Sequence, residues 1–208
     1  MLEHLPLWIG ALMRNVRAGH AKLAIVQPEL AIGGTPIDLS SPAFAYGARL
    51  PERFTADGAG ISPPLVWGDV PAGTRSLALI VEDPDAPAPN PIVHAIVWGI
   101  APTEHRLEEG AMVANGGTGK GSDTGRNSAF GEGWLPPDPP AGHGSHDYAF
   151  QLFALADVPD LAGHPGRSAL LKAMAGKVLA AGLLVGTYSR GEEARIGGSP
   201  QKAPRPVR

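Results

Sequence analysis

The sequence predicts a mostly β fold, an antiparallel β-sandwich with peripheral helices, and three observations support this. Glycine and proline account for 50 of the 208 residues (28 Gly and 22 Pro), which favours many turns and argues against a helical bundle. Apolar runs of strand length are bounded by loops rich in these two residues. Strand-like and helix-like segments do not alternate regularly, which argues against a doubly wound parallel sheet.

Five apolar segments have the length and composition of strands. Two of them flank a loop that contains two aspartates and four prolines, and we expect these two to be buried core strands. The predicted strands are Leu65–Trp67, Leu77–Val81, Ile92–Ile100, Asp147–Ala156 and Leu183–Tyr188.

Two other segments have helical periodicity. Apolar residues recur at helical spacing over Leu2–Ala18, which predicts an amphipathic helix. It is expected to pack on its own domain, to form a dimer contact or to lie on a membrane surface. A second apolar stripe predicts one late, C-terminal helix, with Ser168 as its N-cap and Gly182 at its end.

The chain divides into three predicted parts. Residues 1–30 are expected to form an N-terminal helical extension, and residues 31–190 a folded β domain. Residues 191–208 combine few apolar side chains with several glycines and prolines, so we expect a flexible tail.

Composition excludes several classes of function. A net charge of −3 gives no indication of nucleic-acid binding, which usually requires a basic patch. The chain has no cysteine, which excludes disulfides, thiolate catalysis and zinc–thiolate sites. No apolar run reaches the roughly 18 residues of a transmembrane helix. The N-terminal segment lacks the pattern of a signal peptide, so a cytoplasmic location is expected.

The loop between the two core strands carries the first candidate site. Asp83 and Asp85 stand in this loop, and His94 follows near the start of the next strand. Titratable groups at the ends of rigid strands are typical of binding sites. Each residue also has a structural interpretation. An aspartate before proline commonly starts a turn, and a histidine in an apolar run commonly belongs to the core.

A second cluster follows a proline-rich loop. His146 and Tyr148 lie at the start of a predicted strand, where they would form the opposite wall of a pocket. A nearby carboxylate stabilises a protonated imidazole, so Asp83 or Asp85 is expected to keep His94 or His146 cationic near neutral pH. That cation would bind phosphate, sulfate or carboxylate, with hydrogen bonds from Tyr148 and backbone N–H groups.

Other hypotheses remain open for these residues. Ser128 would serve a hydrolase acting on a phosphate or acyl compound if a histidine and an aspartate lay beside it, although its surroundings do not resemble a nucleophile elbow. A third possibility is a dimeric interaction module that does not use its pocket. His143, in the glycine- and proline-rich loop, is expected to be exposed. A metal site would use suitable ligand types but no familiar spacing, and its ligands would be Asp83, Asp85, His94 and His146.

Two motifs, in this order, resemble the phosphatidylethanolamine-binding protein family, in particular its bacterial branch of Raf-kinase-inhibitor-like proteins. The first is DPDAP at residues 83–87, followed by His94 in PIVHAIVW. The second is GRNSAFGEGWLPPDPPAGHGSHDYAFQLFAL at residues 125–155. Each motif is weak alone, but the ordered pair is specific, and the resemblance extends over residues 44–190.

The resemblance implies a β-sandwich with a small anion pocket at one end. The family's pocket accepts phosphate-like groups, including phospholipid head groups. A non-enzymatic binding protein without cofactor or metal is therefore expected, with a kinase or protease as a regulated partner. A homodimer is expected separately, from the amphipathic N-terminal helix. The resemblance places these residues at the pocket: Asp83, Asp85, His94, Pro137, Gly142, His146, Tyr148 and Tyr188.

Three positions depart from the family pattern. Pro136 stands where glycine is usual, and a proline has no backbone N–H to offer an anion. Asp147 replaces an arginine, which exchanges a positive charge near the pocket for a negative one. Ala95 stands where an aromatic residue is common, which predicts a wider pocket.

Overall fold

The two apolar runs that flank the proline-rich loop form neighbouring central strands. β3 (Ser76–Asp83) pairs with β4 (Ile92–Ile100) on one side and with β7 (His146–Leu155) on the other. β8 (Val178–Tyr188) and β6 (Asp123–Thr124) complete a five-stranded sheet in the order β6-β4-β3-β7-β8. Every neighbouring pair in this sheet is antiparallel.

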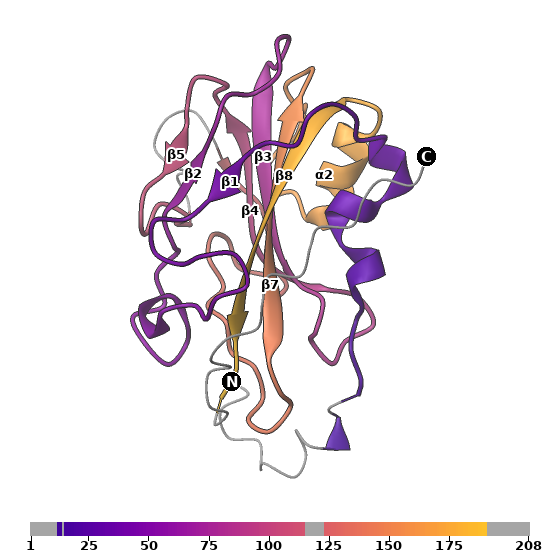
Figure 1. Cartoon of the computed structure of the whole chain (residues 1–208). Helices are drawn as coiled ribbons and strands as arrows, with labels where there is room; N and C mark the ends of the chain where they lie inside the picture. Colours follow the sequence, from indigo (N-terminus) through magenta and orange to yellow (C-terminus); the bar gives the residue numbers. More distant parts are fainter. Residues whose placement is uncertain (1–11, 14, 115–122, 191–208) are drawn as a thin grey trace.

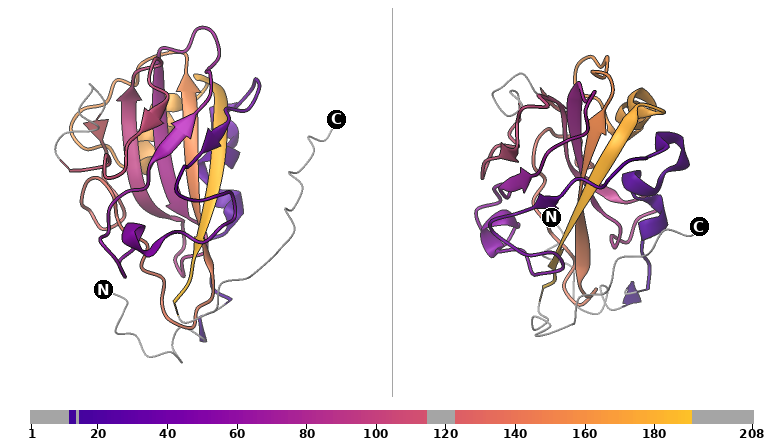
Figure 2. Two further views of the ribbon diagram at one scale, coloured as in Figure 1. Left: turned by 60° about the vertical axis from the view of Figure 1, so that its left-hand side comes forward. Right: turned by 45° about the horizontal axis from the view of Figure 1, so that its top comes forward.

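A smaller sheet lies against one face of the large one. It consists of β1 (Leu39–Ser40), β2 (Leu65–Trp67) and β5 (Arg106–Leu107), also paired antiparallel. The views from the front and the side show the two sheets as layers (Figures 1 and 2). The predicted antiparallel β-sandwich is therefore confirmed. The structure, a computed structural model, describes residues 12–13, 15–114 and 123–190.

Apolar residues cover both faces of the large sheet. One core cluster fills the space between the sheets, and a second lies under α2 (Arg167–Met174) and three short 3₁₀ helices. Because both faces are covered, all eight residues of β3 are buried, which explains why this strand reads as a continuous apolar run. The 3₁₀ helices are η1 (His20–Lys22), η2 (Ala24–Val26) and η3 (Pro28–Leu30), and a fourth, η4 (Glu52–Phe54), precedes β2.

A buried carboxylate fixes the N-terminal segment to the sheet. Glu82 of β3 is fully buried and accepts hydrogen bonds from the backbone N–H of Ala24 and the side-chain amide of Gln151. It also forms an ion pair with Arg167 of α2. One acidic side chain thus connects η2, β7 and α2. Its partners satisfy a charge that would otherwise be costly to bury.

The late helix is shorter than predicted. α2 begins after Gly166 rather than after Ser168 and ends at Met174, and the chain turns at Gly176 with φ 68°. The segment from Val178 onward, predicted partly as helix, is strand β8. Gly182 is not a helix stop. A Cβ atom there would lie 2.6 Å from the carbonyl oxygen of Ile37, so glycine is needed where another segment crosses the strand closely.

Most of the predicted N-terminal helix, Leu2–Ala18, lies outside the described residues. Within them, residues 16–18 are not helical, because Ala18 donates its N–H to the carbonyl of Ala86 across the loop after β3. Gly19 donates in the same way to Pro84. The segment around Ala18 is thus tied to the DPDAP loop. The predicted tail, residues 191–208, also lies outside the described residues.

Candidate functional site

Strand direction brings the two predicted clusters together. β3 lies between β4 and β7 and runs antiparallel to both, so its C-terminal end meets the N-terminal ends of its neighbours. Asp83 is the last residue of β3, His94 is the third residue of β4 and His146 is the first of β7. All three therefore lie at one end of the large sheet.

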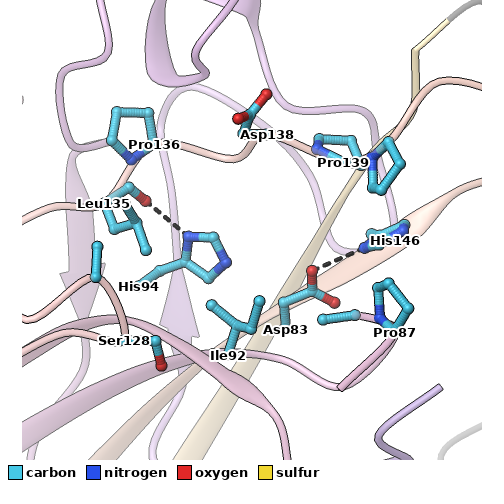
Figure 3. A pocket seen from close by; sticks show the side chains of 13 residues that line it. Asp83, Pro87, Ile92, His94, Ser128, Leu135, Pro136, Asp138, Pro139 and His146 are labelled. Carbon is cyan, nitrogen blue, oxygen red and sulfur yellow. Dashed lines mark hydrogen bonds and ion pairs between the residues drawn. The ribbon is translucent and has the colours of Figure 1, made fainter. Parts of the chain in front are cut away.

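A pocket of about 230 Å³ opens at this end of the sheet. Two irregular segments form its rim, the DPDAP loop and the proline-rich loop before β7 (Figure 3). The segment that follows β6 adds Ser128 and Ala129. The lining residues are Asp83, Ala86, Pro87, Ile92, His94, Ser128, Ala129, Leu135, Pro136, Asp138, Pro139, Pro140 and His146.

His94 has one occupied and one open ring nitrogen. Its Nδ1 lies 2.7 Å from the carbonyl oxygen of Leu135, and since a carbonyl only accepts, Nδ1 carries a proton. Its Nε2 is buried and has no hydrogen-bond partner among the described residues. Burial lowers the pKa of His94 below its ordinary value, more strongly than Asp83 raises it. Of the two histidines expected to carry the charge, His94 is therefore the less favourable, and its Nε2 presents a lone pair.

His146 lies in a chain of three hydrogen bonds. Its Nδ1 is 2.7 Å from Oδ2 of Asp83, and its Nε2 is 2.7 Å from Nδ1 of His143. Nε2 of His143 donates in turn to the carbonyl oxygen of Met13 at 2.8 Å. With Asp83 ionised, these bonds require one more proton than two neutral imidazoles hold. Burial lowers the pKa of His143, which favours placing the positive charge on His146, beside Asp83.

Asp85 is not among the lining residues. Its Oδ1 is 2.6 Å from Nη1 of Arg17, and its Oδ2 accepts the backbone N–H of Asp147 at 2.7 Å. The side chain of Asp147 faces His20 at 3.1 Å. Burial and the nearby charge of Asp85 raise the pKa of Asp147, while the hydrogen bond to His20 lowers it. These contacts tie the N-terminal segment to the outer side of the DPDAP loop.

The predicted metal set does not come together as one group. Among the described residues, the ligand atoms that approach one another within 4.8 Å belong to His20, Asp85 and Asp147. Arg17 already neutralises Asp85 in that group.

Two predicted tyrosines lie behind or beside the pocket. Tyr148 is fully buried, its ring packs edge-on against His94 with centroids 5.1 Å apart, and its hydroxyl has no hydrogen-bond partner among the described residues. Burial raises the pKa of Tyr148 well above its ordinary value, and Asp83 and Asp138 add to this. Tyr188 instead donates to Asp57 at 2.7 Å and is not among the lining residues.

The remaining predicted residues shape the loops. The carbonyl of Pro137 accepts the N–H of Ala56, and Gly142 turns the chain with φ 81°. Neither belongs to the lining set, in contrast to Pro136, which does. Ala95 is packed in the core between the sheets, so the alanine at this position does not line the pocket.

Ser128 lies on the same pocket as the histidines. Its hydroxyl oxygen accepts the backbone N–H of Val93 at 2.8 Å, and it has no hydrogen bond to a described histidine. His94 and His146 line the pocket with it, so proximity alone does not exclude the hydrolase hypothesis. The structure lacks the hydrogen bond from serine to a general base that activates such a nucleophile.

Sequence reasoning missed two participants. His143 was expected to be exposed, but it is fully buried against His146. The spacing His-x-x-His in front of a strand is a signal that could have indicated this contact. Asp138 lines the pocket and forms an ion pair with Arg190, which also binds Asp57. Nothing in the local sequence indicates a partner 52 residues away.

Comparisons with known proteins agree with this fold. The family model described as phosphatidylethanolamine-binding protein matches residues 40–189. A UPF0098 protein of Methanothermobacter thermautotrophicus is 41% identical over 155 residues, covering 74% of this chain and 100% of the relative. Another from Mycobacterium tuberculosis is 42% identical over 168 residues, covering 81% of this chain and 77% of the relative.

Solved structures show the same relationship. A phosphatidylethanolamine-binding protein homologue from Chlamydia trachomatis, CT736, is 37% identical with a TM-score of 0.68, covering 76% of this chain and 99% of that one. YbcL of Escherichia coli is 26% identical with a TM-score of 0.69, covering 74% and 99%. The fold is an antiparallel β-sandwich with a pocket at one end of its large sheet. The chain belongs to the phosphatidylethanolamine-binding protein family.

Cellular location is not fixed by these relatives. No helix among the described residues has the length and apolarity needed to cross a membrane. A relative from Mycobacterium tuberculosis, 40% identical over 157 residues, is named as a lipoprotein, LppC. The cytoplasmic location therefore stays a prediction.

Proposed function

We propose that this chain is a non-catalytic binding protein that holds a small oxyanion, such as a phosphate group, in the pocket formed by Asp83, His94 and His146. The observation that carries the proposal is the open Nε2 of His94, a buried polar atom without a partner among the described residues. Buried polar atoms in folded proteins are nearly always hydrogen-bonded, so an orphan atom at a pocket points to a ligand.

Two further features support an oxyanion as the ligand. His146 places a positive charge at the pocket wall, although Asp83 neutralises much of it. The buried hydroxyl of Tyr148, which has no partner among the described residues, can donate one hydrogen bond. Both features are consistent with modest affinity, because a strong anion site would have an uncompensated cation or several N–H donors.

A titration with inorganic phosphate tests the proposal. We expect the imidazole signals of His94 and His146 to shift in NMR spectra, while exposed His105 serves as the internal control. A phosphate titration that moves neither pocket histidine, up to millimolar concentrations at pH 6, contradicts the proposal. A shift of all three together indicates a nonspecific ionic effect and also contradicts it.

The regulatory part of the proposal rests on the family relationship. We propose a kinase or protease as the class of protein partner, with the pocket ligand controlling the interaction.

The homodimer through the N-terminal segment is also a proposal. Its support among the described residues is the exposure of Leu12 and Val16, which are 77% and 53% exposed. Size-exclusion chromatography of the full chain and of a Leu12→Ser variant distinguishes a dimer from a monomer.

A further inference from the structure

The pocket wall offers few hydrogen-bond donors. Four of its lining residues are prolines, which have no backbone N–H, and they are Pro87, Pro136, Pro139 and Pro140. Both ring nitrogens of His146 are already bonded, to Asp83 and to His143. The backbone N–H of Leu135 donates to the carbonyl of His94. The usual donors of an anion site are therefore absent or occupied at these positions.

Acceptors, in contrast, face the ligand from three elements. The lone pair on Nε2 of His94 comes from β4 and the carboxylate of Asp83 comes from β3. Asp138, whose carboxylate is paired with Arg190, comes from the proline-rich loop. Asp83 has two oxygens that accept from His146 and from the N–H of Asp85, and each keeps a second lone pair. The nearby donors are the hydroxyl of Ser128, which lines the pocket, and that of Tyr148 on β7, whose ring packs against His94 and whose hydroxyl has no partner among the described residues.

This arrangement is the reverse of what a fully ionised oxyanion needs. A dianion without a proton would place its oxygens beside the lone pair of His94 and the oxygens of Asp83 and Asp138, both of which are ion-paired, and none of these atoms can donate a hydrogen bond to it. An oxyanion that keeps one O–H group can donate that proton to an acceptor of the wall and accept a hydrogen bond from Tyr148. A site with such acceptors rejects analogues that lack the hydrogen, because its buried polar groups are then left unpaired.

We propose that the pocket selects oxyanions that carry a P–OH group, namely phosphate monoesters in their monoanionic form and inorganic phosphate, over sulfate and over phosphate diesters. The inference rests on the proposed function and specifies the ligand class. It also separates two sources of phosphate chemistry. The head group of an intact phospholipid is a diester without a P–OH group, so we expect a soluble monoester to bind better.

Four probes of similar size test the selection by calorimetry and NMR on the full chain at pH 6 and pH 8. Methyl phosphate loses its last P–OH proton near pH 6, so its affinity is expected to fall about 50-fold between these values. Inorganic phosphate keeps one P–OH group at pH 8, so its affinity is expected to fall much less. Sulfate and dimethyl phosphate carry no such proton. We expect both to bind at least about tenfold more weakly than methyl phosphate at pH 6.

The same probes distinguish protonation of the ligand from protonation of His94. Asp83, His146 and Tyr148 are the titratable groups that surround His94. Protonation of the protein would change the affinity for sulfate and dimethyl phosphate along with that for methyl phosphate. Equal binding of sulfate and methyl phosphate at pH 6, or parallel pH profiles for methyl and dimethyl phosphate, overturns the inference but leaves the proposed function standing. Failure of all four probes to bind overturns the proposed function itself.

Two variants locate the acceptors. Asp83→Asn replaces a lining carboxylate oxygen by an amide, and we expect the preference for methyl phosphate over sulfate to shrink several-fold. Because Asp83 also holds His146, Asp138→Asn on the partly exposed loop is the second variant, and it is expected to shrink the preference without loss of folding. Unchanged preference in a folded form of both variants overturns the assignment of acceptors.

Discussion

The two sides of the pocket hold a histidine in opposite ways. On the β4 side, His94 uses one ring nitrogen for the Leu135 carbonyl and leaves the other open. On the β7 side, His146 uses both nitrogens, for Asp83 and for His143. Both residues are almost fully buried, so exposure does not distinguish them. The difference lies in their partners, which leave His94 available to a ligand and make His146 part of the scaffold.

The two aspartates of the DPDAP loop differ in the same way. Asp83 lines the pocket and pairs with His146, whereas Asp85 points to Arg17 and to the backbone N–H of Asp147. Two aspartates that are only two positions apart thus differ in role, because Asp83 lines the pocket and Asp85 does not. Proximity to a site in sequence does not establish contact with its ligand.

Removing the carboxylate that pairs with His146 on the β7 side of the pocket should have the largest effect on stability. Asp83→Ala leaves the buried, charged His146 without its counterion, and we expect the free energy of unfolding to fall by about 3–5 kcal/mol. Chemical denaturation measures this. Asp157→Ala, at an exposed ion pair, is the matched control and should change stability by less than about 0.5 kcal/mol. Similar values for the two variants would show that the buried pair does not stabilise the fold.

The pH dependence of stability tests the β4 side. The pKa of His94 is lowered in the folded state, so between that value and about 6.5 the unfolded chain binds more protons than the folded one. The free energy of unfolding should therefore fall as the pH drops from 7 to 5, and His143 contributes in the same direction. A His94→Gln variant should flatten this dependence, whereas His105→Gln should not. Stability that is constant across this range contradicts a neutral, buried His94.

The buried hydroxyl of Tyr148 should matter for the ligand and not for the fold. Tyr148→Phe removes a polar atom that has no partner among the described residues, so the free energy of unfolding should stay the same or rise by about 1 kcal/mol. Phosphate affinity should fall about tenfold, because a donor to a charged group is lost. Calorimetry and thermal unfolding check the two parts. A marked loss of stability would mean that the hydroxyl is bonded within the protein.

The fold could largely be predicted because its signals are local. The continuous apolar run of β3 and the proline-bounded start of β4 appear directly in the sequence. Val178 and Leu179 could not be assigned correctly, because their spacing continues the apolar stripe of α2. Their place in a strand depends on a contact with residues far away in the sequence. Gly182 permits the close approach of Ile37, and nothing near either residue indicates it.

The candidate site could be predicted as a set of residues but not as a set of roles. The motifs brought Asp83, His94 and His146 together, and all three line one pocket. Their protonation depends on burial and on partners such as Leu135 and His143, which only the folded chain positions. The sequence could not decide between His94 and His146 as the cation for this reason, since burial lowers the pKa of His94 more strongly than the nearby carboxylate raises it.

The smallest effect is expected at the rim. Ser128→Ala removes a hydroxyl that accepts the N–H of Val93 at an exposed position, where water can replace it, so stability should change by no more than about 0.5 kcal/mol. Phosphate affinity should stay within about twofold, since Ser128 is exposed and a water molecule can take the place of its hydroxyl.

The same variant separates the binding protein from the hydrolase. In a hydrolase, Ser128 would be the nucleophile, and His94, whose Nε2 is open, would be its base. Hydrolysis of p-nitrophenyl acetate and p-nitrophenyl phosphate by the full chain should be as slow with Ser128→Ala as without the substitution. A rate that depends on Ser128 and follows the protonation of His94 would show instead that the open nitrogen serves catalysis. In a binding protein, that nitrogen serves only to hold the ligand, and Ser128→Ala leaves the background rate unchanged.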